Sequence, residues 1–210
     1  MHTYITTSLV GERAGDIFRD IFIRDADGKI LIDGPEGKPA LDINHPIQKI
    51  VMHSRFAAVD GLSVTYQLDT GENLTLNRGF QRPDLYANAI EFGGETPSAL
   101  TRQATDLVMR YAENERLVGV SGRTGFHPWY RGNVILWLAF VIYDTAKGTT
   151  RVVNPVRPLD TPGQGEAEAA LAQGAQFYVS DVLALGGFHT QGDGYGSLPG
   201  LFFYKNEGAQ

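Results

Sequence analysis

The sequence predicts an all-β fold in which three similar antiparallel sheets surround one core. An apolar strand, a loop rich in Gly, Ser and His, and a second apolar strand that ends in an aromatic residue follow one another repeatedly. This pattern occurs three times, in residues 50–66, 117–140 and 182–204. The closing aromatics recur at close to a third of the 210-residue chain; they are Tyr66, Phe140 and Tyr204. Such repeats place their loops on exposed surfaces, where function usually resides.

The first predicted element is a hairpin. Ile17–Arg24 has the composition of an opening strand, and Lys29–Ile32 is a short return strand. Between them, Asp25–Gly28 is a turn signal, because Asp and Gly favour tight turns. A Gly/Pro-rich loop follows over residues 33–39.

The remaining strands are predicted from β-rich or alternating segments. Residues 69–71 are a turn between two of them. Residues 134–143 are a continuous apolar run, as expected for a well-buried strand. The predicted strands are 47–52, 62–68, 73–76, 118–120, 134–143, 178–185 and 201–204.

Two stretches, residues 78–106 and 144–176, interrupt the repeat. Structureless loops longer than roughly 15 residues are uncommon in compact domains, so we expect both stretches to have local structure or to be partly mobile. Short helices are predicted at Ser98–Arg102 and at Glu166–Gln173. Because strands of the repeat lie on both sides of each stretch, residues 1–210 are predicted to form a single domain with two insertions.

The amino-acid composition disfavours some classes of binding partner and indicates a cellular location. The formal net charge of −6 disfavours nucleic acid and anionic membranes, which attract basic faces. The chain contains no cysteine, which excludes disulfides and thiolate chemistry. Its most apolar run, residues 134–143, is shorter than the roughly 20 residues of a membrane-spanning helix, so no membrane insertion is expected. The N-terminus lacks a signal-peptide pattern, which predicts a cytoplasmic protein or export without a classical signal.

With the repeat laid out, the chain resembles the jacalin-related lectins. Residues 9–20 are similar to that family's Gly-rich start and Phe-Asp-Asp strand, and residues 47–66 to its Ile-rich strand, Ile-Asp-Gly and Val-Thr-Tyr pattern. Residues 115–140 match its middle strand pair, and residues 187–204 its Gly-Phe-His turn and final strand. The resemblance implies a β-prism of three four-stranded Greek-key sheets that binds glycans or glycoproteins.

The family's sugar-binding loop has the pattern Gly-x-x-x-Asp, in which the aspartate accepts hydrogen bonds from two sugar hydroxyls. The resemblance places Asp60 at the aspartate position in the first repeat, with Phe56 in place of the glycine. In the third repeat it places Pro199 there, and Asp193 is the carboxylate nearby. The resemblance therefore implies a β-prism whose sugar-binding motifs depart from the family pattern.

The chemistry of the loop residues gives candidate contacts. An ionised carboxylate accepts hydrogen bonds from neighbouring hydroxyls, and Trp or Tyr faces stack on sugar C–H surfaces. Glycine lets the backbone approach a ligand closely. The predicted carbohydrate-binding residues are Asp60, Gly93, Gly94, Trp129, Tyr130, Gly15, Asp16, Gln191, Asp193 and Tyr195.

Several of these residues also have purely structural interpretations. Asp60-Gly61 is an ordinary turn dipeptide. Trp129 and Phe126 would then plug the end of the prism, and residues 189–197 would form a mobile Gly-rich hairpin tip.

Three functions stay open. The first is a lectin-like protein without catalysis, for which forming homo-oligomers would raise avidity. The second is a protein-interaction or structural module that has lost sugar binding. The third, least favoured, is an enzyme that uses His53, His127 and His189, each in the turn region of a repeat. HExxH, His-x-His and Gly-x-Ser-x-Gly patterns do not occur, so we expect no catalytic residues, metal or cofactor.

Overall fold

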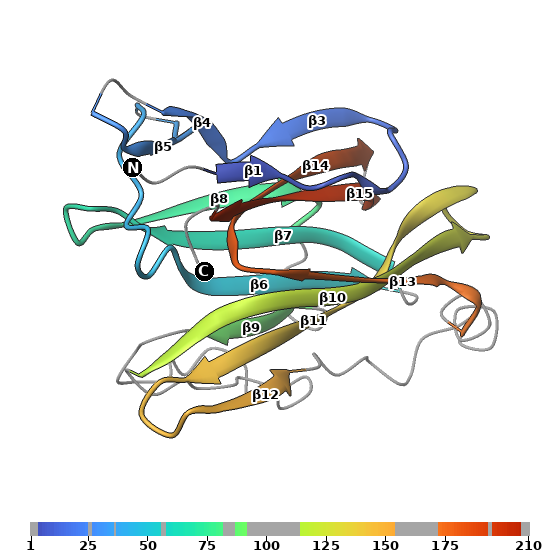
Figure 1. The fold of residues 1–210 in the computed structure, drawn as a ribbon. Helices are drawn as coiled ribbons and strands as arrows, with labels where there is room; N and C mark the ends of the chain where they lie inside the picture. The colour runs from blue at the N-terminus through green and yellow to red at the C-terminus, as the bar shows by residue number, and fades with distance from the viewer. Residues whose placement is uncertain are drawn as a thin grey trace.

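The computed structural model describes residues 4–24, 27–35, 37–55, 58–81, 87–91, 114–153, 172–192 and 195–206. Its strands form three antiparallel sheets and one separate two-stranded hairpin. Figure 1 shows the three long hairpins of these sheets running around a common interior, where their strands contact one another. The predicted all-β fold of three sheets is confirmed.

The first sheet unites the two ends of the described chain. β15 (Tyr195–Asn206) pairs with β14 (Val182–Gly192), β3 (Asp16–Arg19) lies outside β14, and β1 (Tyr4–Thr6) and β2 (Val10–Gly11) both pair with β15. The register places Tyr4 opposite Asn206. Segments from opposite ends of the sequence therefore complete one sheet.

The second and third sheets share a Greek-key order, in which the first two strands form the central hairpin and the other two lie at the edges. The second sheet contains β10 (Glu115–His127), β11 (Gly132–Asp144), β12 (Thr149–Val153) and β13 (Ala175–Ser180). The third contains β6 (Ile47–Arg55), β7 (Ala58–Gln67), β8 (Asn73–Gly79) and β9 (Ala87–Glu91). The separate hairpin is β4 (Ile21–Arg24) with β5 (Ile30–Ile32), as the sequence predicts.

One aromatic side chain from each sheet fills the interior. Tyr66 of β7, Phe140 of β11 and Phe203 of β15 are the largest fully buried side chains, each at most 1% exposed. Aliphatic side chains from all three sheets surround them in one cluster. Burying side chains of this size contributes roughly 1.5–3 kcal/mol each. Two of the predicted closing aromatics, Tyr66 and Phe140, are thus these core rings, whereas in the first sheet the core ring is Phe203, next to the predicted Tyr204.

A buried carboxylate joins the first sheet to the third. Asp20 is 0% exposed and accepts hydrogen bonds from the Tyr66 hydroxyl at 2.5 Å and from Arg78 Nε at 2.7 Å. The Tyr66 hydroxyl in turn accepts the backbone N–H of Leu185 in β14 at 3.2 Å. The backbone of Asp20 also bonds to Leu185 and Asp33. Burial raises the pKa of Asp20, and the Arg78 charge opposes this rise.

Two predicted strands are each divided between two elements. Residues 17–24 form β3 and β4, which separate at Asp20, where the side chain turns inward to its buried partners. Residues 178–185 form β13 and β14, which separate at Asp181. Asp181 has a φ of 58°, a left-handed conformation uncommon for residues other than glycine. At that point the chain leaves the second sheet and enters the first.

The Gly-rich segments predicted as loops are mostly strand. β10 continues to His127 and β14 to Gly192, so the turn of the middle hairpin is only residues 128–131. Gly122 lies beneath the Phe177 ring, because a Cβ there would come within 2.6 Å of a ring atom. Glycine makes room in this strand for an aromatic ring of its neighbour.

The predicted insertions contain edge strands that sequence patterns did not indicate. β9 lies within residues 78–106, and β12 within residues 144–176. The predicted helix at 98–102 lies outside the described residues, as does most of the one at 166–173, of which Ala172 and Gln173 are helical. Within the described part of the chain, no helix has the length and apolarity needed to cross a bilayer.

Replacing Tyr66 by phenylalanine should lower the free energy of unfolding by about 1–3 kcal/mol, because it removes a hydrogen bond to the buried Asp20 and leaves the Leu185 N–H unpaired. Urea unfolding followed by circular dichroism measures the change. Tyr178→Phe is the matched control, since Tyr178 is 60% exposed. An equal loss in both variants would contradict the role given to the Tyr66 hydroxyl.

Candidate functional site

The three long hairpins turn at the same end of the molecule, where the segment between β2 and β3 also lies (Figure 1). We call this end the tip face. It comprises the described residues 11–16, 60–61, 79–81, 124–134, 189–192 and 195–200. Most of the predicted carbohydrate-binding residues lie on these segments.

Contacts between hairpins hold the tip face together. The Asn133 N–H, just after the middle turn, donates to Glu12 Oε2 at 3.3 Å. The Gly196 position of β15 lies against Phe80, because a Cβ at Gly196 would come within 2.5 Å of the Phe80 Cβ. All three sheets therefore contribute to one continuous end surface.

Gly15 and Asp16 are placed beside β14. Asp16 is opposite His189 in the register of β3 and β14. Gly15 has a φ of 82°, and a Cβ there would lie 2.2 Å from the His189 carbonyl oxygen, so only glycine fits. Gln191 follows two residues beyond His189 on the same strand, and Asp16 and Gln191 are both exposed. The predicted polar contacts of the first sheet thus lie close together.

Tyr195 and Gly192 close the β14–β15 hairpin. They are partners in the register, and the Tyr195 ring lies across Gly192, since a Cβ at that glycine would come within 2.7 Å of the ring. Tyr195 is 50% exposed. Its ring is therefore supported from below and presents area to solvent. Asp193 lies outside the described residues.

Pro199 occupies the position at which the resemblance expects the sugar-binding aspartate. It is buried, and its carbonyl oxygen accepts the Glu12 N–H at 3.0 Å. A Cβ at Gly11 would come within 2.2 Å of the same oxygen. This position therefore ties β15 to the β2–β3 segment and offers no carboxylate.

The middle hairpin exposes aromatic side chains at its tip. Trp129 is 61% exposed and Phe126 59% exposed, so neither plugs the end of the prism. Tyr130 is half-buried, and its ring meets the His127 ring edge-on at 5.2 Å between centroids. Tyr130 also packs against the small apolar cluster of Ala58, Val134 and Leu136. The turn therefore presents Trp129 outward on an anchored base.

Asp60 differs from its predicted setting. It lies within β7, not in a turn, and it is 0% exposed. The pairing of β6 with β7 shifts register between His53, opposite Gly61, and Ser54, opposite Val59, so Asp60 is the extra residue of a bulge. The Tyr130 hydroxyl donates a hydrogen bond to Asp60 Oδ1. Two residues predicted to contact sugar are thus brought together as partners of each other.

The three turn-region histidines have different surroundings. His53 Nε2 lies 3.3 Å from Ser63 Oγ, but that hydroxyl donates to Gln81 Oε1 at 2.5 Å. Among the described residues, no group of three or more His, Asp or Glu side chains is arranged to hold a metal ion. Gly93 and Gly94, predicted as a partner loop, lie outside the described residues.

His189 is a half-buried base whose strand position lies opposite Asp16. Its ring lies 6.0 Å from that of Phe18, and no described residue bonds to its buried Nδ1. Burial lowers the pKa of His189; the nearby Asp16 opposes this shift and Arg78 reinforces it. The imidazole is therefore held in its neutral form more strongly than in the unfolded chain.

Removing the Tyr130 hydroxyl should loosen the middle tip, because the buried Asp60 carboxylate loses a donor. We expect Tyr130→Phe to lower the free energy of unfolding by about 1–3 kcal/mol. Urea unfolding measures the loss. Tyr195→Phe, at a half-exposed ring of the same face, should change stability little. Equal stability of the wild type and Tyr130→Phe would show that this bond contributes nothing.

Acidification should reduce stability through His189. Because its folded pKa is below the unfolded value of about 6.5, the unfolded chain binds the proton first, and the free energy of unfolding falls as the pH drops below that value. His189→Gln should flatten this dependence in urea unfolding at a series of pH values. His45→Gln, at an exposed histidine, is the control. An unchanged pH slope in His189→Gln would refute the assignment.

The three-sheet fold is similar to that of solved lectin structures. No protein-family model and no curated protein sequence matches the chain. A mannose-binding jacalin-related lectin from Ananas comosus matches with a TM-score of 0.54 and 19% identity over 96% of each chain. A mannose-specific jacalin-related lectin from Morus nigra, in complex with mannose, matches with a TM-score of 0.53 and 17% identity over 96% of this chain and 94% of that one.

A single-chain recombinant jacalin matches with a TM-score of 0.54 and 15% identity, over 98% of this chain and 96% of that one. The matches span nearly the whole of each structure, including all three sheets, while the sequences have diverged. The chain has the β-prism fold of the jacalin-related lectins.

Proposed function

We propose that the protein binds carbohydrate at the tip face and catalyses no reaction. The observation that carries the proposal is the set of exposed aromatic and polar side chains on this face of a fold whose solved neighbours are lectins. Glycans or glycoproteins would be the partners. Single shallow sites bind weakly, so multivalent ligands or homo-oligomers would raise avidity.

Two groups of side chains would contact the sugar, one by stacking and the other by hydrogen bonding. The rings of Trp129 and Tyr195 offer exposed faces to the C–H surface of a sugar. Asp16 and Gln191 supply a carboxylate and an amide beside the first sheet. Because the carboxylate accepts from hydroxyls and the amide both donates and accepts, the pair matches sugar hydroxyls. Asp16 would thus act in place of the aspartate that Pro199 replaces.

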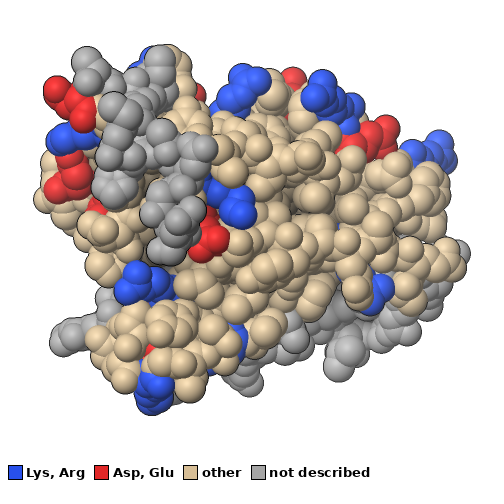
Figure 2. Space-filling view, in the orientation of Figure 1, with Lys and Arg blue, Asp and Glu red and all other residues tan. Residues whose placement is uncertain are grey.

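The charge distribution agrees with a neutral ligand. On the face shown in Figure 2, acidic and basic side chains are interspersed, mainly along the upper edge, around a broad uncharged area. A nucleic-acid-binding protein would instead concentrate lysine and arginine on one stripe. The formal net charge of −6 also disfavours nucleic acid as a ligand.

Truncating either exposed ring should weaken glycan binding. Since the Ananas and Morus proteins bind mannose, mannotriose is the first ligand to test. We expect Trp129→Ala and Tyr195→Ala each to raise its Kd about tenfold, or about 1.4 kcal/mol, in calorimetric titration. Tyr178→Ala removes an equally exposed ring from β13 and should leave the Kd unchanged. Silence of the wild type across an array of neutral and charged glycans would end the proposal.

A second candidate is a protein-interaction module that kept the fold and lost sugar binding. The exposure of Phe126 beside Trp129 favours it, because adjacent exposed aromatics are typical of protein interfaces. The buried Pro199 favours it too, since the usual carboxylate is missing. A silent glycan array, together with a binding partner that the wild type captures and Trp129→Ala does not, would select this function.

A further inference from the structure

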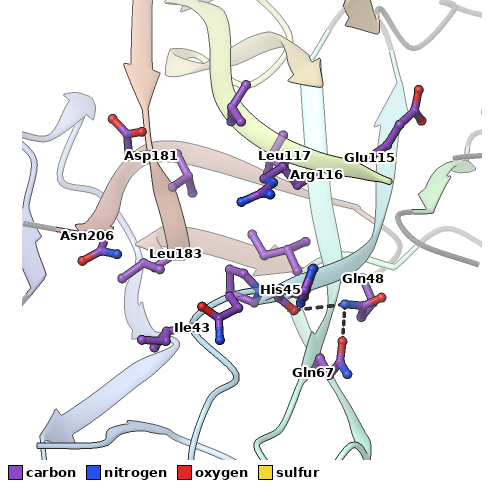
Figure 3. Close-up of a pocket in the computed structure, with 15 residues that line it drawn as sticks. Ile43, His45, Gln48, Gln67, Glu115, Arg116, Leu117, Asp181, Leu183 and Asn206 are labelled. Carbon is purple, nitrogen blue, oxygen red and sulfur yellow. Dashed lines mark hydrogen bonds between the residues drawn. The ribbon is translucent and has the colours of Figure 1, made fainter. Parts of the chain in front are cut away.

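A cavity of about 260 Å³ lies at the end of the prism opposite the tip face. We call it the end pocket. The segment before β6 and the end of β7 form one wall, and the start of β10 a second. The start of β14 and the end of β15 form the third wall (Figure 3). All three large sheets therefore meet at this pocket, as they do at the tip face.

Backbone hydrogen bonds preform the walls of the end pocket. The Gln67 N–H donates to the Pro46 carbonyl at 3.0 Å, and the Asp181 N–H donates to the Val118 carbonyl at 2.9 Å. The Asn206 N–H donates to the Asp181 carbonyl at 3.3 Å. The two bonds of Asp181 join the second sheet to the first. A ligand would thus meet a cavity whose backbone is already ordered, which reduces the entropic cost of binding.

The floor of the end pocket is the end of the hydrophobic core. Ile47, Val182 and Leu183 line the cavity and belong to the buried cluster. Leu117 adds a partly buried aliphatic surface from β10. The described lining residues include no Phe, Tyr or Trp, and their one aromatic ring is the imidazole of His45 on the wall before β6. The floor itself therefore offers aliphatic contact.

Two glutamines place complementary hydrogen-bonding groups on one wall. Gln48 Nε2 donates to Gln67 Oε1 at 2.6 Å and to the His45 carbonyl at 3.0 Å (Figure 3). These bonds use the amide donors of Gln48 and leave its carbonyl oxygen as an acceptor. They also fix Gln67 with its NH2 group available as a donor. An acceptor and a donor held side by side suit hydroxyl groups, which do both.

The charged groups of the end pocket favour a neutral ligand. Arg116 is exposed, and the described residues supply no hydrogen-bond or ion-pair partner for its guanidinium. Two carboxylates, those of Glu115 and Asp181, also line the pocket, and Glu115 is held by Arg151 through two bonds of 2.8 and 3.1 Å. A single available guanidinium near two carboxylates would bind an anion poorly, but it donates well to hydroxyl oxygens.

A strained backbone conformation at the edge of the end pocket also favours a ligand site there. Asp181 has a φ of 58°, and backbone conformations of this kind cost of order 1–3 kcal/mol outside glycine. Such strain often marks binding sites, and here it lies on the wall where the second sheet passes into the first.

We propose that the end pocket is a second saccharide site, which takes one neutral hexose unit. The aliphatic floor would contact the C–H face of the ring. Arg116 and the Gln48–Gln67 pair would bond its hydroxyls. This site is independent of the one proposed at the tip face. With a site at each end of the prism, a single chain would bridge two glycans without forming oligomers.

Chemical-shift titration of the ¹⁵N-labelled protein with methyl α-mannopyranoside and methyl β-galactopyranoside tests the proposal. We expect dose-dependent shifts at the amides of Leu117 and Leu183 with at least one glycoside. Arg116→Ala should raise the Kd reported by these amides about tenfold or more. Arg123→Ala, on the same strand at the other end, is the matched control and should leave that Kd unchanged.

The same spectra separate the two proposed sites. Trp129→Ala should leave the shifts at Leu117 and Leu183 intact, even if the tip face binds nothing. The end-pocket proposal is overturned if these two amides fail to respond to either glycoside. It is equally overturned if sodium acetate produces the same shifts, because the pocket then takes an anion, or if Arg116→Ala binds as the wild type does.

Discussion

The three-sheet core depends on a carboxylate that has no contact with water. Burying an ion of this kind costs several kcal/mol unless partners satisfy it. Asp20 has such partners in the Tyr66 hydroxyl and the Arg78 guanidinium, which come from adjacent strands of the third sheet. Because burial still raises the pKa of Asp20, its contribution to stability is greatest when it is protonated and declines as the pH rises through that raised pKa.

The cluster of Asp20, Tyr66 and Arg78 also fixes the alignment of the strands that carry it. Few other alignments of β3, β7 and β8 would satisfy all of its hydrogen-bonding groups. The Asp60–Tyr130 bond joins the third sheet to the second in a similar way.

The periodicity of the sequence predicted the fold because it reflects core positions. Tyr66 and Phe140 lie where the third and second sheets each contribute a ring to the interior, so the repeat in the sequence predicts the long hairpins. Strand lengths were not predictable in the same way. Gly122 suggested a loop, yet it is in a strand because the Phe177 ring crosses it, and that contact depends on the pairing of β10 with β13. The breaks at Asp20 and Asp181 were missed for a related reason: both depend on contacts with strands distant in sequence.

The candidate site was predicted in part. Trp129 and Tyr195 are exposed at hairpin tips, where loop composition placed them, and Gly15 has the left-handed backbone that its residue type allows. The burial of Asp60 could not be predicted from the sequence around it. An Asp-Gly pair is typical of turns, and only the register shift between β6 and β7 explains why this one is buried in a strand. The end pocket had no sequence signal, because its lining comes from short pieces of five separate segments.

The pairing of Tyr4 with Asn206 has a consequence for biosynthesis. Most contacts of the second and third sheets are available once the middle of the chain has left the ribosome, since each sheet is continuous in sequence. The first sheet is different, because β1, β2 and β3 need β14 and β15, which are made after the strands of the other two sheets. Bringing such distant segments together carries a large loop-closure cost and slows folding. The strands β1, β2 and β3 therefore stay unpaired, with exposed backbone hydrogen-bonding groups, until β14 and β15 have been synthesised. Chaperones that shield such unpaired strands would act during that interval.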